Sequence, residues 1–437
     1  MNRTISLVII TTVLCVFAGT LSYFICNIPS YDDYAATLIF IKNHYYQNPD
    51  TAEKIRALLI PHGEHYILLS RGSAALFYTI FGTINFSALV WYQNIYLLAI
   101  FVLILFIIKN QRISYFPVLV PITLFLFNLS HWQVALYYWG GIQYYAVFFF
   151  SFLSLFLLHI SVTKPSHFYF FGALFFAAIA LVSFGNGILV LPLGFFFLAV
   201  KNKRSYLTVW TLFSLLGVIF FLSGFHGSFS NKPPFNPFWM AKLLFTFLGS
   251  FLYVNPAAQF WSHANIVLCF VAGLGVFGFW LMLLFKGYAF KNPFLYCLLS
   301  LPILTGILIA MARYDSKAAG GIAPRYMFFS ACLPIFLLLI FQDIKKTKFP
   351  VILPTLSLIM LLWMLSFVNN WRDIQRNNRE ISQTLEQWLE NPATPLVYYN
   401  PDPRYAEALQ WALEHGVYSY SPAGQPSGTI RLSQSPP

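Results

Sequence analysis

The chain has 437 residues, of which 58% are hydrophobic and only 9% charged. This composition leaves too little polar surface for a water-soluble globule, so it excludes that class and indicates a polytopic membrane protein. The net charge of +12 comes largely from Lys and Arg in short loops between apolar segments. Membrane topology explains that pattern, so we expect no nucleic-acid partner.

Apolar segments long enough to cross a bilayer recur along the chain. We expect an all-α fold with about eleven transmembrane helices, at residues 5–26, 86–108, 115–130, 143–161, 168–185, 187–200, 206–223, 264–285, 292–312, 326–342 and 349–368. The first segment is longer than the apolar part of a usual signal peptide and lacks a small-residue cleavage site, so we expect a retained anchor.

Two other apolar stretches, 66–84 and 240–254, contain Arg71 and Lys242 respectively. Because a charge at the centre of a span is costly, we expect both to be interfacial helices on the outer face. With the N-terminus in the cytoplasm, the short Lys- and Arg-rich loops then all fall on the cytoplasmic side, and the C-terminus lies outside.

The loop at 27–85 is much longer than a connection requires. It contains two helix-compatible pieces, Asp33–Tyr45 and Thr51–Ile60. It also holds the first five of the fourteen carboxylates in the chain, and the 250 residues from 65 to 314 contain none. We therefore look for acid–base chemistry in this loop and in the later acidic block.

Asp32 and Asp33 follow the first apolar segment. Two adjacent carboxylates cannot both point the same way, and their mutual repulsion raises one pKa, so one of them can act as a base while the other orients it. The alternative is that one of the pair only caps the helix that begins near Tyr34. Both interpretations stay open on the sequence alone.

His62, Glu64 and His65 form a second polar cluster in the same loop. Three interpretations fit it: solvated residues that open the interfacial helix, groups that hydrogen-bond a substrate, or ligands of a metal ion. The spacing differs from the HExxH arrangement of zinc proteases, since His62 and Glu64 do not share a helical face.

The loop at 313–326 places Arg313, Lys317 and Arg325 between two expected spans, with Tyr326 after them. This loop is on the expected outer side, so the positive-inside rule does not account for its cations. Arg313 and Arg325 suit a clamp on a lipid phosphate, because arginine makes forked hydrogen bonds to phosphate oxygens. Snorkelling to lipid headgroups is the alternative.

An aromatic run from His131 to Tyr145 includes Tyr138 and Gln143. It fits either an interfacial aromatic belt or a groove that contacts a sugar or an isoprenoid. The following outer turn, Ser183–Gly187, contains two glycines that the tight turn itself explains.

Together, the long first loop with its Asp-Asp pair, the interfacial helices, the Glu64-His65 pair and the late Arg325-Tyr326 pair resemble the GT-C superfamily of integral-membrane glycosyltransferases. The resemblance covers residues 1 to about 370 in topology. It implies a bacterial inner-membrane enzyme that moves a sugar, with inversion, from a polyprenyl-phosphate carrier to a surface glycan, a lipid or an exported protein such as a pilin.

The resemblance also implies residue roles. Asp32 or Asp33 would be the catalytic base, and the other would hold the acceptor or a metal. Arg313 and Arg325 would neutralise the departing phosphate, and the substrate-binding set would be Glu64, His65, Arg313, Lys317, Arg325, Tyr326, Tyr138 and Gln143. Some members of the superfamily use a divalent metal ion and others do not, so no metal ligands are assigned.

Residues 1–370 are thus expected to form the transmembrane catalytic module, and 371–437 a small periplasmic tail. An apolar stripe from Trp371 to Trp388 predicts a helix that opens the tail, followed by a short strand near 395–401 and a helix near Arg404–His415. We expect the last fifteen or so residues to be disordered. The rival function is transport of a lipid-linked sugar.

Overall fold

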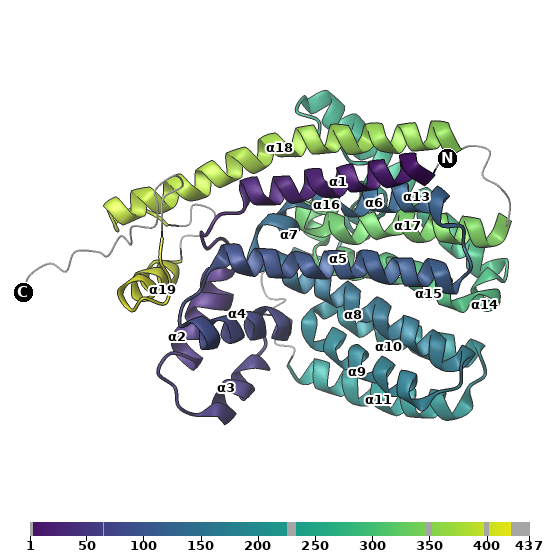
Figure 1. The fold of residues 1–437 in the computed structure, drawn as a ribbon, viewed down its shortest axis with the longest axis horizontal. Helices are drawn as coiled ribbons and strands as arrows, with labels where there is room; N and C mark the ends of the chain where they lie inside the picture. Colours follow the sequence, from purple (N-terminus) through teal and green to yellow (C-terminus); the bar gives the residue numbers. More distant parts are fainter. Residues whose placement is uncertain (1–2, 64, 225–232, 346–351, 397–401, 421–437) are drawn as a thin grey trace, which may run out of the picture.

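The computed structural model describes residues 3–63, 65–224, 233–345, 352–396 and 402–420. Within these ranges the regular structure is helical, and β-pairing is limited to the isolated bridges His62–His65 and Ile84–Tyr418. Figure 1 shows most of the long helices running roughly parallel to one another in one bundle. The fold is that of an all-α polytopic membrane protein.

Eight helical stretches in the described part of the chain are long and apolar enough to cross a membrane. They are α1 (Arg3–Phe24), α5 (Phe86–Asn110), the stretch 118–136 that joins α6 (Tyr115–Leu126), η2 (Leu129–His131) and α7 (Trp132–Leu136), α8 (Tyr138–Thr163), α11 (Arg204–Ser223), α13 (Gln259–Phe285), α15 (Pro293–Ala312) and α17 (Pro324–Lys345). All eight coincide with expected spans.

The remaining three expected spans are different. Two correspond to shorter apolar helices, α9 (His167–Ser183) and η3 (Gly185–Leu189) with α10 (Val190–Val200). At 1.5 Å per residue, the 17 residues of α9 reach roughly 25 Å, short of a hydrocarbon core about 30 Å thick. The third falls on α18 (Ile352–Glu390), with residues 349–351 outside the described ranges.

The two stretches expected to be interfacial are short helices. α4 (Leu68–Phe81) buries Arg71 and Ala74 on one face and exposes Leu76, Ile80 and Phe81 on the other, a pattern that suits a helix lying at the membrane surface. α12 (Pro237–Gly249), followed by η4 (Ser250–Leu252), instead packs among α13, α15 and α17. α12 is not among the eight candidate spans, and its interfacial position stays a prediction.

Glycines allow α12 and α13 to pack with their backbones in contact. A Cβ atom on Gly273 would lie 1.8 Å from the carbonyl oxygen of Phe245, and one on Gly249 would lie 1.9 Å from that of Cys269. Small residues at such crossings are typical of helix packing in membranes.

α18 is a continuous helix of 39 residues, about 58 Å long. It passes without a break through residue 370, where the composition had suggested a boundary between module and tail. Its second half buries Ile374, Ile381, Leu385 and Trp388, which confirms the predicted apolar stripe. Figure 1 shows α18 running beside α1 and extending beyond it.

The end of the bundle beyond Phe24 carries the helices of the long first loop and the last described helix. These are a π-helical turn η1 (Tyr34–Ile39), α2 (Phe40–His44), α3 (Thr51–Leu58), α4 and α19 (Pro403–Glu414). They lie together at the left in Figure 1, whereas the N-terminus and α14 (Tyr288–Lys291) lie at the right. We call the first of these regions the loop end. Both helices expected in the loop, and the tail helix, are confirmed within a few residues.

Asn27 joins three parts of the loop end. Its Oδ1 accepts the backbone N–H of Phe86 at 2.8 Å, its Nδ2 donates to the carbonyl of Ser419 at 3.1 Å, and its own carbonyl accepts the Tyr418 hydroxyl at 2.6 Å. The segment that follows α19 is thereby fixed to the beginning of the first loop. The strand expected at 395–401 and the disorder expected near the C-terminus fall mainly outside the described residues.

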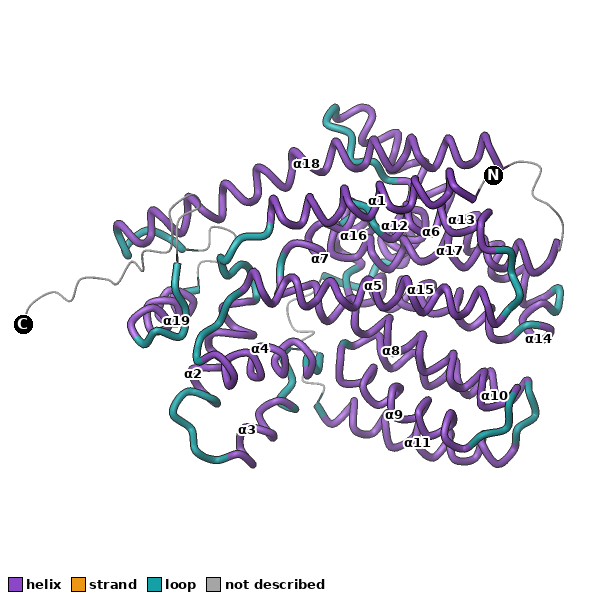
Figure 2. Tube along the Cα trace, in the orientation of Figure 1, coloured by secondary structure: helices purple, strands orange, loops and turns teal. Residues whose placement is uncertain are grey.

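Polar side chains also tie the opposite end of the bundle together. Asn292 donates to Gln111 at 3.1 Å and to Asp343 at 3.0 Å, and Tyr288 donates to Asp343 at 2.8 Å. These bonds join the C-terminal ends of α5 and α17 to α14 and the start of α15. Figure 2, in the same orientation, shows the short loops that connect the helices there.

Candidate functional site

The two adjacent aspartates occupy different environments. Asp33 is only 1% exposed, and its Oδ2 accepts the backbone N–H of Ser30 at 3.0 Å. It makes no capping bond to the helix that follows, so the capping interpretation does not apply to it. Burial raises the pKa of the Asp33 carboxyl well above its ordinary value, which favours the neutral acid. Asp32, by contrast, is exposed.

Asp32 and Arg71 have opposite effects on the pKa of His62. Burial lowers the pKa of His62, Asp32 opposes that shift, and Arg71 adds to it. The backbone holds His62 in a tight turn: its N–H donates to the carbonyl of His65 at 2.8 Å, and the bond from His65 back to His62 is 3.2 Å long. Glu64, expected to bind substrate, lies outside the described residues.

His65 packs against the turn between α9 and α10. Its ring centre is 4.6 Å from that of Phe184. A Cβ atom on Gly185 would lie 2.5 Å from Nδ1 of His65. Any side chain at position 185 would displace the His65 ring. Glycine is therefore favoured there by this contact as well as by the tight turn that the sequence suggested.

Tyr144, in α8, lies where the first loop and the late cationic loop meet. It interacts electrostatically with Asp32, Arg313 and Arg325. Its ring centre is 5.0 Å from that of Phe184 and 6.2 Å from that of Tyr326. One exposed carboxylate and two arginines, from distant parts of the sequence, thus interact electrostatically with one phenol. We call Asp32, Tyr144, Arg313 and Arg325 the Tyr144 cluster.

The arginines differ in how they are held. The guanidinium of Arg325 is partly covered and lies 5.0 Å from the ring centre of Tyr326, a cation–π distance. Arg313 is exposed at the end of α15.

Lys317 is oriented toward another partner. Its Nζ lies 4.3 Å from the ring centre of Trp239 in α12. Its backbone has φ of 53° and ψ of −142°, a conformation that residues other than glycine rarely adopt. It begins α16 (Lys317–Gly321), after η5 (Tyr314–Ser316). The expected role of Lys317 in substrate binding therefore gains no support from its contact.

Tyr138 and Gln143 are both buried. The Tyr138 hydroxyl donates to the carbonyl of Ser70 at 2.5 Å, and Nε2 of Gln143 donates to the carbonyl of Trp139 at 3.0 Å. The first bond joins α8 to α4, and the second lies within α8. Both side chains therefore interact with protein groups rather than with solvent.

Two consecutive hydrogen bonds link Tyr31, the residue before Asp32, to Asn377 and then to Tyr137. The Tyr31 hydroxyl donates to Oδ1 of Asn377 at 3.0 Å, and Nδ2 of Asn377 donates to the Tyr137 hydroxyl at 2.6 Å. Tyr31 has a positive φ of 52°, which costs roughly 1 to 3 kcal/mol for such a residue. The second half of α18 thus holds the backbone next to Asp32.

Tyr31, Arg71, Tyr144 and Asn377 were not among the expected site residues. Tyr144 had a signal, because it lies in the aromatic run next to Gln143. Asn377 had none, since a lone Asn in a polar helix carries no pattern that points to a partner 346 positions away.

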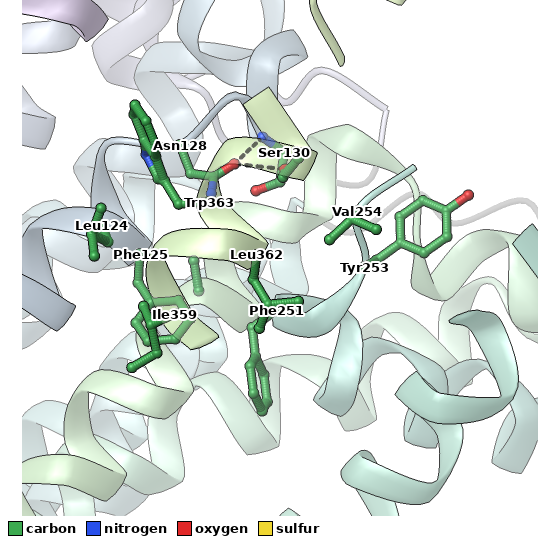
Figure 3. Close-up of a pocket in the computed structure, with 12 residues that line it drawn as sticks. Leu124, Phe125, Asn128, Ser130, Phe251, Tyr253, Val254, Ile359, Leu362 and Trp363 are labelled. Atoms are coloured by element: carbon green, nitrogen blue, oxygen red, sulfur yellow. Dashed lines mark hydrogen bonds between the residues drawn. The ribbon is translucent and has the colours of Figure 1, made fainter. Parts of the chain in front are cut away.

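A small pocket lies elsewhere, between α6, η4, α17 and the apolar half of α18 (Figure 3). Asn128 closes its polar side by accepting the N–H of Ser130 and the hydroxyl of Ser366, each at 2.8 Å. Its free volume of about 10 Å³ accommodates about one water molecule, so it is no substrate site. No group of three or more potential metal ligands occurs among the described residues.

Comparison with known proteins identifies no relative: no family model, no curated protein and no solved structure matches the chain. The helices themselves define the class, an all-α multi-pass membrane protein.

Proposed function

We propose that the chain is a GT-C-like glycosyltransferase that moves a sugar from a polyprenyl-phosphate carrier to an acceptor at the loop end. The observation that carries the proposal is the Tyr144 cluster, in which an exposed carboxylate and two arginines interact electrostatically with one phenol. Transfer from a lipid phosphate requires a base for the acceptor and positive charge for the leaving group, and this cluster contains both.

Asp32 would be the base. It is exposed, whereas Asp33 is buried and bonded to Ser30, and burial raises the pKa of its carboxyl. The Asp32 carboxylate would take the proton of the acceptor hydroxyl as that oxygen attacks the anomeric carbon. The bond from the anomeric carbon to the phosphate oxygen would break at the opposite face, with inversion. Asp33 would then serve the local fold.

Arg313 and Arg325 would receive the polyprenyl phosphate as it leaves. Negative charge develops on that phosphate in the transition state, and one well-placed donor is worth roughly 3 to 4 kcal/mol in other enzymes. Phosphate is already a good leaving group, so no general acid is required. The aromatic groups Tyr144, Tyr326 and Phe184 around the arginines would contact the sugar or the first isoprene units.

The proposal is tested by expressing variants in a host that lacks the protein and following its surface glycans, glycolipids and exported proteins by mass spectrometry. We expect a mass of hexose or pentose size that disappears with Asp32→Asn and with Arg325→Gln. Asp315→Asn removes an exposed carboxylate from the neighbouring loop and is the matched control. Wild-type products from Asp32→Asn and Arg325→Gln, at equal membrane abundance, would overturn the proposal and favour transport.

A further inference from the structure

Arg71 is a buried cation on the protein-facing side of α4. The residue is only 7% exposed, while Leu76, Ile80 and Phe81 of the same helix form the exposed face. A snorkelling arginine would extend along the exposed face toward headgroups. Arg71 instead extends inward, toward α2 and the end of α3.

Neutral groups hold the guanidinium in place. Nη1 donates to the carbonyl of Ile60, and the guanidinium lies 4.9 Å from the ring centre of Phe40. Nε is fully buried without a hydrogen-bond partner. Nη2 has no partner in the described part of the chain and is not fully covered, so it is the atom that remains open to a ligand.

No carboxylate of the described chain lies within ion-pair distance of Arg71. Burial alone lowers the pKa of Arg71, to about 10, so the side chain is still charged at neutral pH. A buried charge is costly unless an opposite charge or a set of hydrogen bonds compensates it. An anion at Nη2 would supply that charge.

The titratable side chains near Arg71 do not compensate its charge. Asp32 and Arg71 both interact electrostatically with His62, with opposite effects on its pKa. A neutral imidazole beside Arg71 can donate one further hydrogen bond to an oxyanion. The pair His62 and Arg71 thus combines a fixed positive charge with an adjacent donor.

We propose that Arg71 and His62 form a binding site for a phosphate group, distinct from the Arg313 and Arg325 pair. The site does not depend on glycosyl transfer. The phosphate could come from a membrane lipid headgroup or from a soluble phosphorylated ligand, since both offer the same oxygens to a guanidinium. If transfer takes place at the Tyr144 cluster, this second site would hold the acceptor or an anionic lipid beside Asp32.

The test uses the full chain in nanodiscs of phosphatidylcholine, in an Arg313→Gln/Arg325→Gln background that removes the other candidate phosphate site. Inorganic phosphate is titrated at constant ionic strength, and the apparent affinity is obtained from the shift in thermal unfolding midpoint. We expect binding to persist in this background and to weaken at least roughly ten-fold with Arg71→Gln, because a charge-assisted hydrogen bond is lost.

Arg56→Gln is the matched control, because it removes the same charge from an exposed position of the same loop. It should leave the phosphate response unchanged. Arg71→Lys keeps the charge but loses the forked pair of guanidinium donors, so this variant should bind phosphate with intermediate affinity. If Arg71→Gln does not fold, His62→Gln in the same background should weaken binding instead.

Two results would overturn the proposal: no phosphate response in the Arg313→Gln/Arg325→Gln background, or an equal response in Arg71→Gln and Arg56→Gln. Nanodiscs that contain a polyprenyl monophosphate distinguish the sources, because a lipid ligand would stabilise the protein, in an Arg71-dependent manner, without added phosphate. Asp32→Asn separates this site from glycosyl transfer, since it should abolish transfer and leave phosphate binding intact.

Discussion

The Tyr31 hydroxyl donates a hydrogen bond of 3.0 Å to Asn377, 346 positions further along the chain. This bond connects the first loop to the second half of α18, directly beside the exposed Asp32. Asn377 also donates to Tyr137, so one buried amide serves both tyrosines. The position of Asp32 therefore depends on a helix that follows the bundle in the sequence.

Replacement of Asn377 should loosen the segment around Asp32. Asn377→Ala leaves the Tyr31 and Tyr137 hydroxyls with fewer partners, and we expect a loss of about 1 to 3 kcal/mol in the free energy of unfolding. Transfer activity should fall as well. Chemical unfolding in detergent measures the first effect. Gln383→Ala, at an exposed position of the same helix, is the control and should have little effect.

Asp33 should make the stability of the protein depend on pH. Its folded-state pKa is raised by burial, so its contribution to stability is complete below its ordinary pKa of about 4 and decreases as pH rises toward the folded-state value. Relative to Asp33→Asn, the wild type should lose up to about 1.4 kcal/mol per pH unit in that window. Unfolding curves of both proteins between pH 4 and pH 8 measure the difference.

Asp33→Asn should also retain the proposed transfer activity, in contrast to Asp32→Asn. The amide can still accept the Ser30 N–H through its oxygen. A constant stability difference across the pH range would show that Asp33 does not ionise with a raised pKa. An inactive but folded Asp33→Asn would show that the two aspartates were assigned the wrong roles.

Gly273 and Gly275 of α13 should respond differently to the same substitution. A Cβ atom on Gly273 would meet the Phe245 carbonyl at 1.8 Å, whereas one on Gly275 would have no atom within 4 Å. Gly273→Ala should force α12 and α13 apart and cost about 1 to 3 kcal/mol or more. Gly275→Ala should be neutral or slightly stabilising. Thermal unfolding midpoints of the two variants test the close crossing, and equal midpoints would argue against it.

Lys317 offers a comparison that isolates backbone strain. Lys317→Gly and Lys317→Ala both lose the contact with Trp239, but only glycine adopts φ near 53° with ψ near −142° without strain. The Gly variant should therefore be more stable than the Ala variant by about 1 to 3 kcal/mol. Thermal unfolding provides the measurement, and a less stable Gly variant would contradict the prediction.

Hydropathy was sufficient to predict the helices because each span must satisfy its own backbone in lipid, which leaves a long apolar run in the sequence. α9 and α10 match the two segments expected on either side of the Gly185-Asn186-Gly187 turn, but each is shorter than the bilayer is thick. α12, which contains Lys242, is not among the eight candidate spans, but the sequence did not reveal its packing among α13, α15 and α17. The close packing of α12 on α13 at Gly249 and Gly273 depends on the tertiary structure, and the hydrophobic periodicity of either segment does not predict it.

The candidate site was predictable only in its charged residues. Asp32, Arg313 and Arg325 stand out because charges are rare in this chain, and all three interact electrostatically with Tyr144. The environments of Asp32 and Asp33 could not be distinguished, since burial depends on how the loop folds back on Ser30. The contacts of Tyr31 with Asn377 and of His65 with Gly185 join distant segments, and neither leaves a local pattern.

The three bonds of Asn27 impose an order on assembly. Phe86 is synthesised soon after Asn27, but Tyr418 and Ser419 follow about 390 residues later. At a synthesis rate of roughly 5 to 20 residues per second, the first loop must wait on the order of 20 to 80 seconds for these partners. During that interval the aromatic surface that later stacks Tyr34 on Tyr405 is uncovered. The Tyr34–Tyr405 stack is thus a contact that only a nearly complete chain can form.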